Sequence, residues 1–158
     1  MRLLLLFLLI PILTFSQNET DDLVGITSRI ELQNDPYYGP VFQAEYAAYT
    51  INEEVLNELK TYLYSYQISI VMGTWCGDSQ EQVPHFIKIL DQLDYNTKNL
   101  RIIGVDHQKS AEGTNVDQLA IERVPTFIIY DAEANEIGRI IETPTRSLEE
   151  DLLDIIKK

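Results

Sequence analysis

One sulfur atom and one proline-led segment are the parts of this chain best suited to chemistry. Cys76 is the only cysteine, and it lies in the sequence Thr74-Trp75-Cys76-Gly77-Asp78-Ser79. Dithiol redox sites place two cysteines three positions apart, and here the second position holds Ser79. The second segment, Val124-Pro125-Thr126-Phe127, opens a β-branched and aromatic run that can form a wall beside the sulfur. The sequence therefore predicts a reactive thiol that has no internal partner.

The residues around Cys76 predict a strand that leads through a loop into a helix. Ile68–Met72 is a short apolar run that ends at Gly73, which is the pattern of a buried strand. The unpaired amides and the dipole at the start of the next helix favour a negative charge, so a cysteine there is shifted towards the thiolate. Asp78 acts in the opposite sense, because a carboxylate disfavours a second negative charge nearby. The net effect on the ionisation of the Cys76 thiol therefore has no fixed sign. Asp78-Ser79 can also be interpreted as capping residues alone.

Hydrophobic periodicity predicts alternating strands and helices along the rest of the chain. The expected strands are 41–49, 68–72, 100–105, 127–130 and 136–141. The expected helices follow the cap Asn52, surround 83–90, cover the short segment 116–121 and follow the cap Ser147. Strands joined by helical crossovers should be parallel, and the last two should form an antiparallel hairpin. The predicted fold class is α/β, with a central mixed sheet and helices on both faces.

The first 40 residues are expected to lie outside the main domain. A basic residue, an apolar stretch and a small-x-small site make residues 1–16 typical of a signal peptide. An uncleaved membrane anchor is the alternative, although the stretch is shorter than the roughly 18 to 20 residues that cross a bilayer. Residues 17–40 are predicted to form an N-terminal extension and 41–158 the domain. The signal indicates a secreted or periplasmic protein, and the tyrosine-rich stretch 37–66 is expected to cover a sheet edge.

The charge of the chain restricts its partners. The formal net charge is −13, which argues against nucleic acid and anionic membrane surfaces because both are polyanions. An exported protein enters an oxidising compartment, where disulfides form. A single cysteine allows no internal bridge, so the thiol is either buried and inert or exposed and reactive.

These features together resemble the thioredoxin family. The resemblance rests on Trp75-Cys76-Gly77, on Pro84 eight residues after the cysteine, and on Val124-Pro125-Thr126 before a strand, and it covers 41–158. It implies a three-layer sandwich in which Pro125 is cis and lies beside the cysteine. It also implies that the backbone of Val124 pairs with an extended substrate and that Pro84 kinks the helix.

Three positions depart from the family pattern. Ser79 replaces the resolving cysteine, Asp78 replaces the proline that usually precedes it, and Ile70 stands where the family commonly has a buried carboxylate that assists proton transfer. An alcohol cannot displace a thiol to form a disulfide. A mixed disulfide at Cys76 should therefore persist until an outside thiol resolves it.

The favoured hypothesis is a monothiol thiol–disulfide exchange enzyme without a cofactor or metal, whose partners are thiols and disulfides of proteins or small molecules. Cys76 is the predicted nucleophile and Ser79 a hydrogen-bond donor to it. The predicted substrate platform consists of Trp75, Gly77, Asp78, Val124, Pro125 and Thr126. The alternative is a non-catalytic module that binds an extended peptide in the same groove.

A third hypothesis is metal or iron–sulfur binding. The string Cys76-Gly77-Asp78-Ser79 matches the cysteine-glycine-x-serine pattern of monothiol glutaredoxin-like proteins. One cysteine and two histidines make a poor metal cage, however. His85 and His107 are instead expected to be solvated surface groups.

Overall fold

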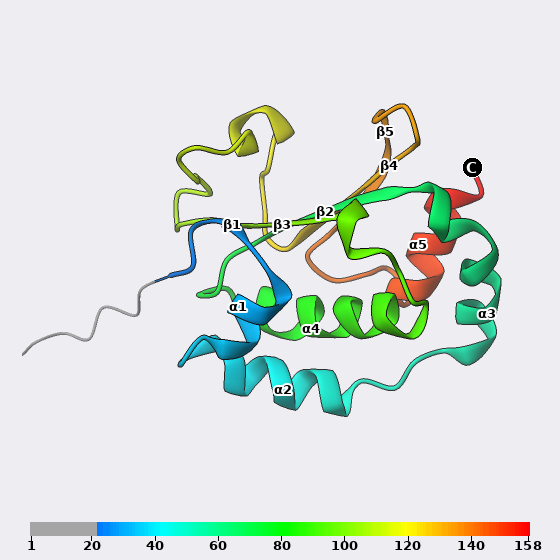
Figure 1. The fold of residues 1–158 in the computed structure, drawn as a ribbon, viewed down its shortest axis with the longest axis horizontal. Helices are drawn as coiled ribbons and strands as arrows, with labels where there is room; N and C mark the ends of the chain where they lie inside the picture. The colour runs from blue at the N-terminus through cyan, green and yellow to red at the C-terminus, as the bar shows by residue number, and fades with distance from the viewer. Residues whose placement is uncertain (1–21) are drawn as a thin grey trace, which may run out of the picture.

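Strand β2 (Gln67–Met72) is the centre of the fold, because five of its six residues are buried. The computed structural model describes residues 22–158, which form a five-stranded mixed sheet in the order β1-β3-β2-β4-β5 (Figure 1). β2 pairs in parallel with β3 and antiparallel with β4, and β4 and β5 form the predicted antiparallel hairpin. The other strands are β1 (Gly25–Thr27), β3 (Leu100–Gly104), β4 (Thr126–Tyr130) and β5 (Glu136–Ile141).

Side chains that alternate along β2 build two cores. Ile68, Ile70 and Met72 enter the large core under the α-helices, whereas Val71 joins a smaller cluster on the opposite face. Figure 1 shows the α-helices on one side of the sheet and the segment 105–125 on the other. The helices are α1 (Arg29–Asn34), α2 (Tyr38–Ala48), α3 (Glu53–Tyr62), α4 (Gly77–Gln92) and α5 (Leu148–Ile156), with short 3-10 helices η1 (Leu63–Ser65), η2 (Thr97–Asn99) and η3 (Val116–Leu119).

The predicted three-layer α/β fold is thus confirmed, with one layer thinner than expected. The short helix predicted at 116–121 is the 3-10 helix η3, and it is the helical element of the segment 105–125. The predicted caps Asn52 and Ser147 both accept hydrogen bonds from the third residue beyond them. Both helices therefore start where the sequence places them.

The strand predicted at 41–49 is wrong, because these residues belong to helix α2 apart from the last. Tyr38, Phe42 and Tyr46 recur every four residues and pack along one face of the helix. The Tyr38 and Phe42 rings are tilted with centroids 6.2 Å apart, and the Phe42 and Tyr46 rings are stacked at 5.9 Å. Pro40 is compatible with a helix here, because the amides of the first turn have no partner within the helix. The boundary predicted between residues 40 and 41 falls inside α2.

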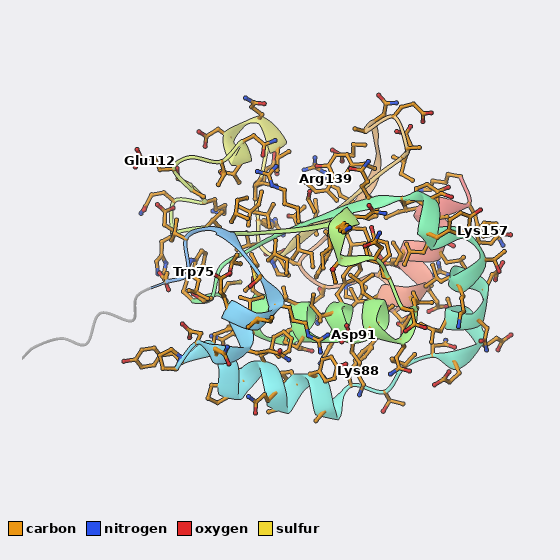
Figure 2. All side chains as sticks on the ribbon, viewed as in Figure 1. Trp75, Lys88, Asp91, Glu112, Arg139 and Lys157 are labelled. Atoms are coloured by element: carbon orange, nitrogen blue, oxygen red, sulfur yellow. The ribbon has the colours of Figure 1, made fainter. Side chains whose placement is uncertain are left out.

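Helix α2 packs on α4 rather than on a sheet edge (Figure 2), so its tyrosines, Tyr38 and Tyr46, do not have the expected position. Asp91 of α4 accepts hydrogen bonds from the Tyr46 hydroxyl at 2.7 Å and from Arg29 of α1. Lys88 donates to the carbonyl of Tyr49 at 2.7 Å. These contacts attach α1 and α2 to α4, the helix that follows Cys76.

The N-terminal segment adds an edge strand and a helix to the domain. β1 pairs antiparallel with β3, and α1 begins with a capping box formed by Ser28 and Glu31. Gly104 permits this approach, since a Cβ there would lie 1.9 Å from the carbonyl oxygen of Leu23. The predicted signal peptide, residues 1–16, lies outside the described residues. Within residues 22–158, no helix has the length and apolar character needed to cross a membrane.

A buried carboxylate joins α5 to the linker between α2 and α3. Glu149 is fully buried and accepts hydrogen bonds from the Tyr49 hydroxyl at 2.7 Å and from the Asn52 amide at 3.0 Å. Burial and this hydrogen bond raise the pKa of Tyr49, so its hydroxyl stays protonated and continues to donate. Glu149 also lies in the first turn of α5, where the helix dipole favours a negative charge.

His85 contradicts the expectation of a solvated surface group. It is only 8% exposed, because α2 and the linker after it cover this side of α4. Its ring stacks on Tyr49 with centroids 4.3 Å apart, and its Nε2 lies 3.1 Å from a carboxylate oxygen of Glu45. The error follows from the misassigned helix, since a strand at 41–49 would have left His85 uncovered.

We predict that Glu149→Ala destabilises the fold far more than Glu150→Ala. The first change leaves two donors without an acceptor, and a buried donor without a partner costs about 1–3 kcal/mol of unfolding free energy. Glu150 has a partly exposed pair with Arg146 at 3.7 Å, and such pairs contribute about 0–1 kcal/mol. Urea unfolding followed by circular dichroism measures both. Equal losses in the two variants would show that the Glu149 contacts do not stabilise the protein.

Candidate functional site

Cys76 lies where β2 turns into α4. The chain leaves the sheet at Gly73, and the Cys76 amide donates to the Gly73 carbonyl at 3.0 Å. Cys76 is the N-cap of α4, with its carbonyl accepting from the Gln80 amide at 2.9 Å. The sulfur therefore sits at the N-terminus of a 16-residue helix, as the sequence predicts, and it is half-buried.

The thiol contacts the proline segment directly. The Cys76 Sγ donates to the carbonyl oxygen of Val124 at 3.1 Å, and the Val124–Pro125 peptide bond is cis. Because a carbonyl oxygen can only accept, this geometry corresponds to the protonated thiol. Val124, Pro125 and Thr126 are all buried, and the Thr126 hydroxyl donates to the Arg123 carbonyl at 2.6 Å. The predicted platform residues Val124, Pro125 and Thr126 thus lie beside the thiol, but with little exposed side-chain surface.

The remaining platform residues differ in their access to solvent. Gly77 is exposed and Asp78 is half-buried, both in the first turn of α4. Ile70, at the position of the family's buried carboxylate, is fully buried in the large core. Among the residues described, no cluster of three or more His, Cys, Asp and Glu is arranged to hold a metal ion.

The Ser79 hydroxyl closes the turn beneath the sulfur. Ser79 is fully buried, and its Oγ accepts from the Gly73 amide at 3.2 Å. The polar contacts of residues 22–158 include none between Ser79 Oγ and Cys76 Sγ, so the donor role of Ser79 stays a prediction. The Ser79 carbonyl accepts from the Tyr38 hydroxyl at 3.1 Å. Burial, and then the charge of a Cys76 thiolate, raise the pKa of Tyr38 and keep it a donor.

The Trp75 ring has close neighbours from its own turn and from the loop after β3. A Cβ on Gly73 would lie 2.5 Å from the indole, so the ring packs directly against that glycine. His107 stacks on the ring with centroids 4.3 Å apart and an interplanar angle of 20°. The indole N–H donates to the Val105 carbonyl at 2.9 Å. The predicted flat surface for a partner is thus covered by a histidine that was expected to be only a surface group.

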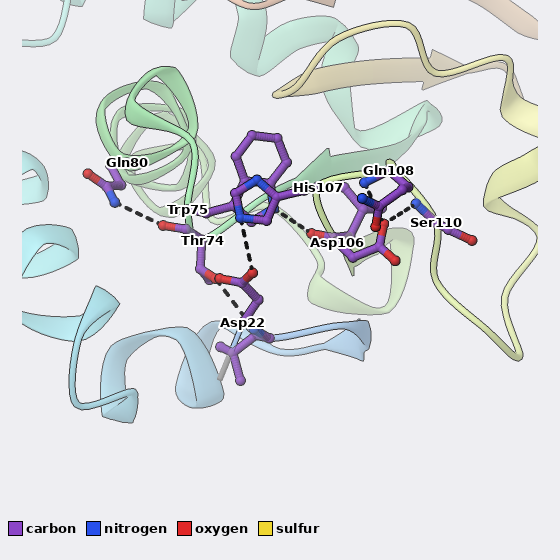
Figure 3. Close-up of polar contacts among 10 residues, drawn as sticks. Asp22, Thr74, Trp75, Gln80, Asp106, His107, Gln108 and Ser110 are labelled. Carbon is purple, nitrogen blue, oxygen red and sulfur yellow. Dashed lines mark hydrogen bonds and ion pairs between the residues drawn. The ribbon is translucent and has the colours of Figure 1, made fainter. Parts of the chain in front are cut away.

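The N-terminal segment also reaches the site. One carboxylate oxygen of Asp22 accepts from the Thr74 hydroxyl at 3.3 Å, and the other lies 3.6 Å from His107 Nε2 (Figure 3). The Leu23 amide donates to the Thr74 hydroxyl at 3.4 Å. Sequence reasoning missed Asp22, Tyr38 and His107 as site residues. No motif or periodicity relates them to Cys76.

The sulfur lies at the margin of the smaller core. Trp75 and Cys76 pack against a cluster made entirely of apolar side chains from β2, β3 and the segment that follows β3. The cluster consists of Val71, Ile103, Val105, Ala111, Val116 and Val124. The site thus combines one thiol, a helix N-terminus, the backbone carbonyl before a cis proline and an apolar cluster.

Comparison with known proteins agrees with this description. Residues 40–153 match the sequence model of a family described as Thioredoxin. A protein of unknown function from Pseudomonas aeruginosa has a similar structure, with 16% identity, a TM-score of 0.60, and coverage of 85% of this chain and 91% of the other. Mitochondrial thioredoxin 3 from Saccharomyces cerevisiae is 22% identical, with a TM-score of 0.40 and coverage of 72% and 97%. No curated protein matches the chain.

We predict that Gly73→Ala displaces the Trp75 ring, whereas Gly77→Ala does not. The added methyl group at 73 would overlap the indole, and overpacking of this kind costs about 1–3 kcal/mol. The same change at 77 meets no heavy atom within 4 Å. Since Trp75 is the only tryptophan, its fluorescence emission maximum reports the displacement, and urea unfolding reports the cost. Unchanged emission in Gly73→Ala would contradict the packing described.

Proposed function

Because this chain belongs to the thioredoxin family, we propose that it is a monothiol thiol–disulfide exchange protein that acts through Cys76. The observation that carries the proposal is the contact between the Cys76 thiol and the Val124 carbonyl at the start of α4. It sets the only thiol of the chain against the backbone segment at which an extended client would pair.

The proposed reaction has two exchange steps. The Cys76 thiolate attacks one sulfur of a client disulfide, a new bond forms between the two sulfurs, and the other client sulfur leaves as a thiolate. An external thiol, ionised, then attacks the mixed disulfide on the client's sulfur and releases Cys76 as a thiolate. The client sulfur ends in a disulfide with the external thiol, so electrons balance without another oxidant. Ser79 cannot perform the second step, because an oxygen cannot replace the resolving sulfur.

The geometry links client pairing to activation of the thiol. The Val124 carbonyl is the acceptor for the Cys76 S–H group, and it is also an acceptor that a client strand would use. A client amide that donates to this carbonyl competes with the thiol and releases the sulfur towards the amides at the start of α4. Those amides and the helix dipole favour the thiolate. Pairing and attack are therefore successive parts of one event.

We place this reaction outside the cytoplasm. The proposal rests on the signal-like pattern of residues 1–16. In such a compartment the external thiol is a small-molecule thiol or another redox protein, and the monothiol site keeps the client bound until that thiol arrives.

We predict that incubation with a glutathione mixed disulfide of a short peptide yields a stable adduct on Cys76. Mass spectrometry without reductant should find the adduct in the unmodified protein and none in Cys76→Ser. Turnover should depend on added glutathione. Capture of the peptide that survives both dithiothreitol and Cys76→Ala would instead show non-covalent peptide binding and contradict the exchange function.

We further predict that Ser79→Cys shortens the life of this adduct. Positions three apart in the first turn of a helix are neighbours, so a thiol at 79 can attack the Cys76 mixed disulfide and form an internal bridge. Ser65→Cys is the matched control, because Ser65 is an exposed residue of η1. Its adduct at Cys76 should persist. Equal adduct lifetimes in the two variants would show that position 79 does not determine the monothiol behaviour.

A further inference from the structure

The indole of Trp75 is enclosed in a way that the exchange reaction alone does not require. Gly73 lies against the ring, and the Val105 carbonyl accepts a hydrogen bond from the ring N–H. The His107 ring stacks on the indole (Figure 3). Because the first two contacts are backbone features, the His107 side chain is the contact that can leave without unfolding the turn.

The His107 side chain, which covers part of the indole, is held by few contacts. The His107 side chain is 64% exposed, and its contacts are the stacked indole and the carboxylate of Asp22, which lies 3.6 Å away. Asp22 is itself attached to the active-site turn through the Thr74 hydroxyl. Exposed ion pairs contribute little stability, so a ligand for the indole can displace the imidazole at low cost.

We propose that His107, held by Asp22, is a specificity-determining residue that a client must move to reach the Trp75 face. The client class that fits is an extended segment with an aromatic side chain next to its disulfide-bonded cysteine. Such a ring replaces the imidazole on the indole and retains the stacking. The identity of the client rests on the proposed exchange function, whereas the existence of the cover does not.

Two groups from other segments face the His107 ring. The Asp22 carboxylate faces it from the N-terminal segment, and the uncharged indole faces it from the active-site turn. On the loop of His107 itself, the Asp106 side chain accepts hydrogen bonds from the amides of Gln108 and Ser110. Asp22 is therefore the carboxylate that holds the imidazole over the indole.

Acrylamide quenching of the single tryptophan tests the cover. We expect His107→Ala to raise the quenching constant. Loss of the stack and the pair predicts roughly a fivefold change in the ratio of open to covered indole. Asp22→Asn should keep the stack and raise the quenching constant less than His107→Ala does. His85→Ala is the matched control, because His85 stacks on Tyr49 and not on Trp75; circular dichroism verifies its fold. A quenching constant unchanged in His107→Ala overturns the cover.

The specificity role is tested with two probes, the glutathione mixed disulfides of Gly-Cys-Phe and Gly-Cys-Gly. At fixed pH we expect His107→Ala to accelerate adduct formation at Cys76 with the phenylalanine probe more than with the glycine probe. Alkylation by iodoacetamide, which needs no indole surface, should be unchanged. Higher quenching with equal acceleration of both probes overturns the specificity role. If neither probe forms an adduct in the unmodified protein, the exchange function fails and the specificity role fails with it, while quenching still decides whether the cover exists.

Discussion

The contact between the Cys76 thiol and the Val124 carbonyl joins segments 48 residues apart, and the rest of the site is arranged around it. Sheet register makes it possible, because Val71 of β2 lies opposite Thr126 of β4. Because the two strands are antiparallel, the end of β2 and the start of β4 lie at the same edge of the sheet. Cys76, which follows β2, and Val124, which precedes β4, therefore lie close together. A shift of one residue in this pairing would reverse the faces of β4 and separate the sulfur from the carbonyl.

The residue at position 79 shows how the fold accommodates the loss of a second sulfur. Its hydroxyl accepts from the Gly73 amide, and its carbonyl accepts from the Tyr38 hydroxyl. The turn below Cys76 is therefore fixed by polar contacts, one of which comes from a helix ahead of β2. The turn thus keeps its shape without an internal disulfide at Cys76.

Sequence reasoning found the parts of this site that depend on strong local patterns. Buried apolar runs predicted β2 and β4. Cys76 follows the first run and Val124 precedes the second, so the sequence could place the thiol beside the proline segment. Helix α2 was missed because its Tyr, Val and Phe residues are common in strands, and its packing on α4 decides in favour of a helix. Asp22 and His107 were missed for a different reason. Periodicity reports which face of an element is buried, whereas these two side chains meet at the surface from distant segments.

The close passage of the N-terminal segment over Gly104 has an effect at a distance. The main chain of Leu23 occupies the space that a side chain at position 104 would need. The glycine therefore determines how closely the N-terminal segment approaches the sheet. Asp22 directly precedes Leu23, so its position depends on the same approach. An alanine at 104, which alters no charge and no functional group, would lift the carboxylate from its histidine. The missing side chain at the end of β3 thus governs an electrostatic contact beside the Cys76 site.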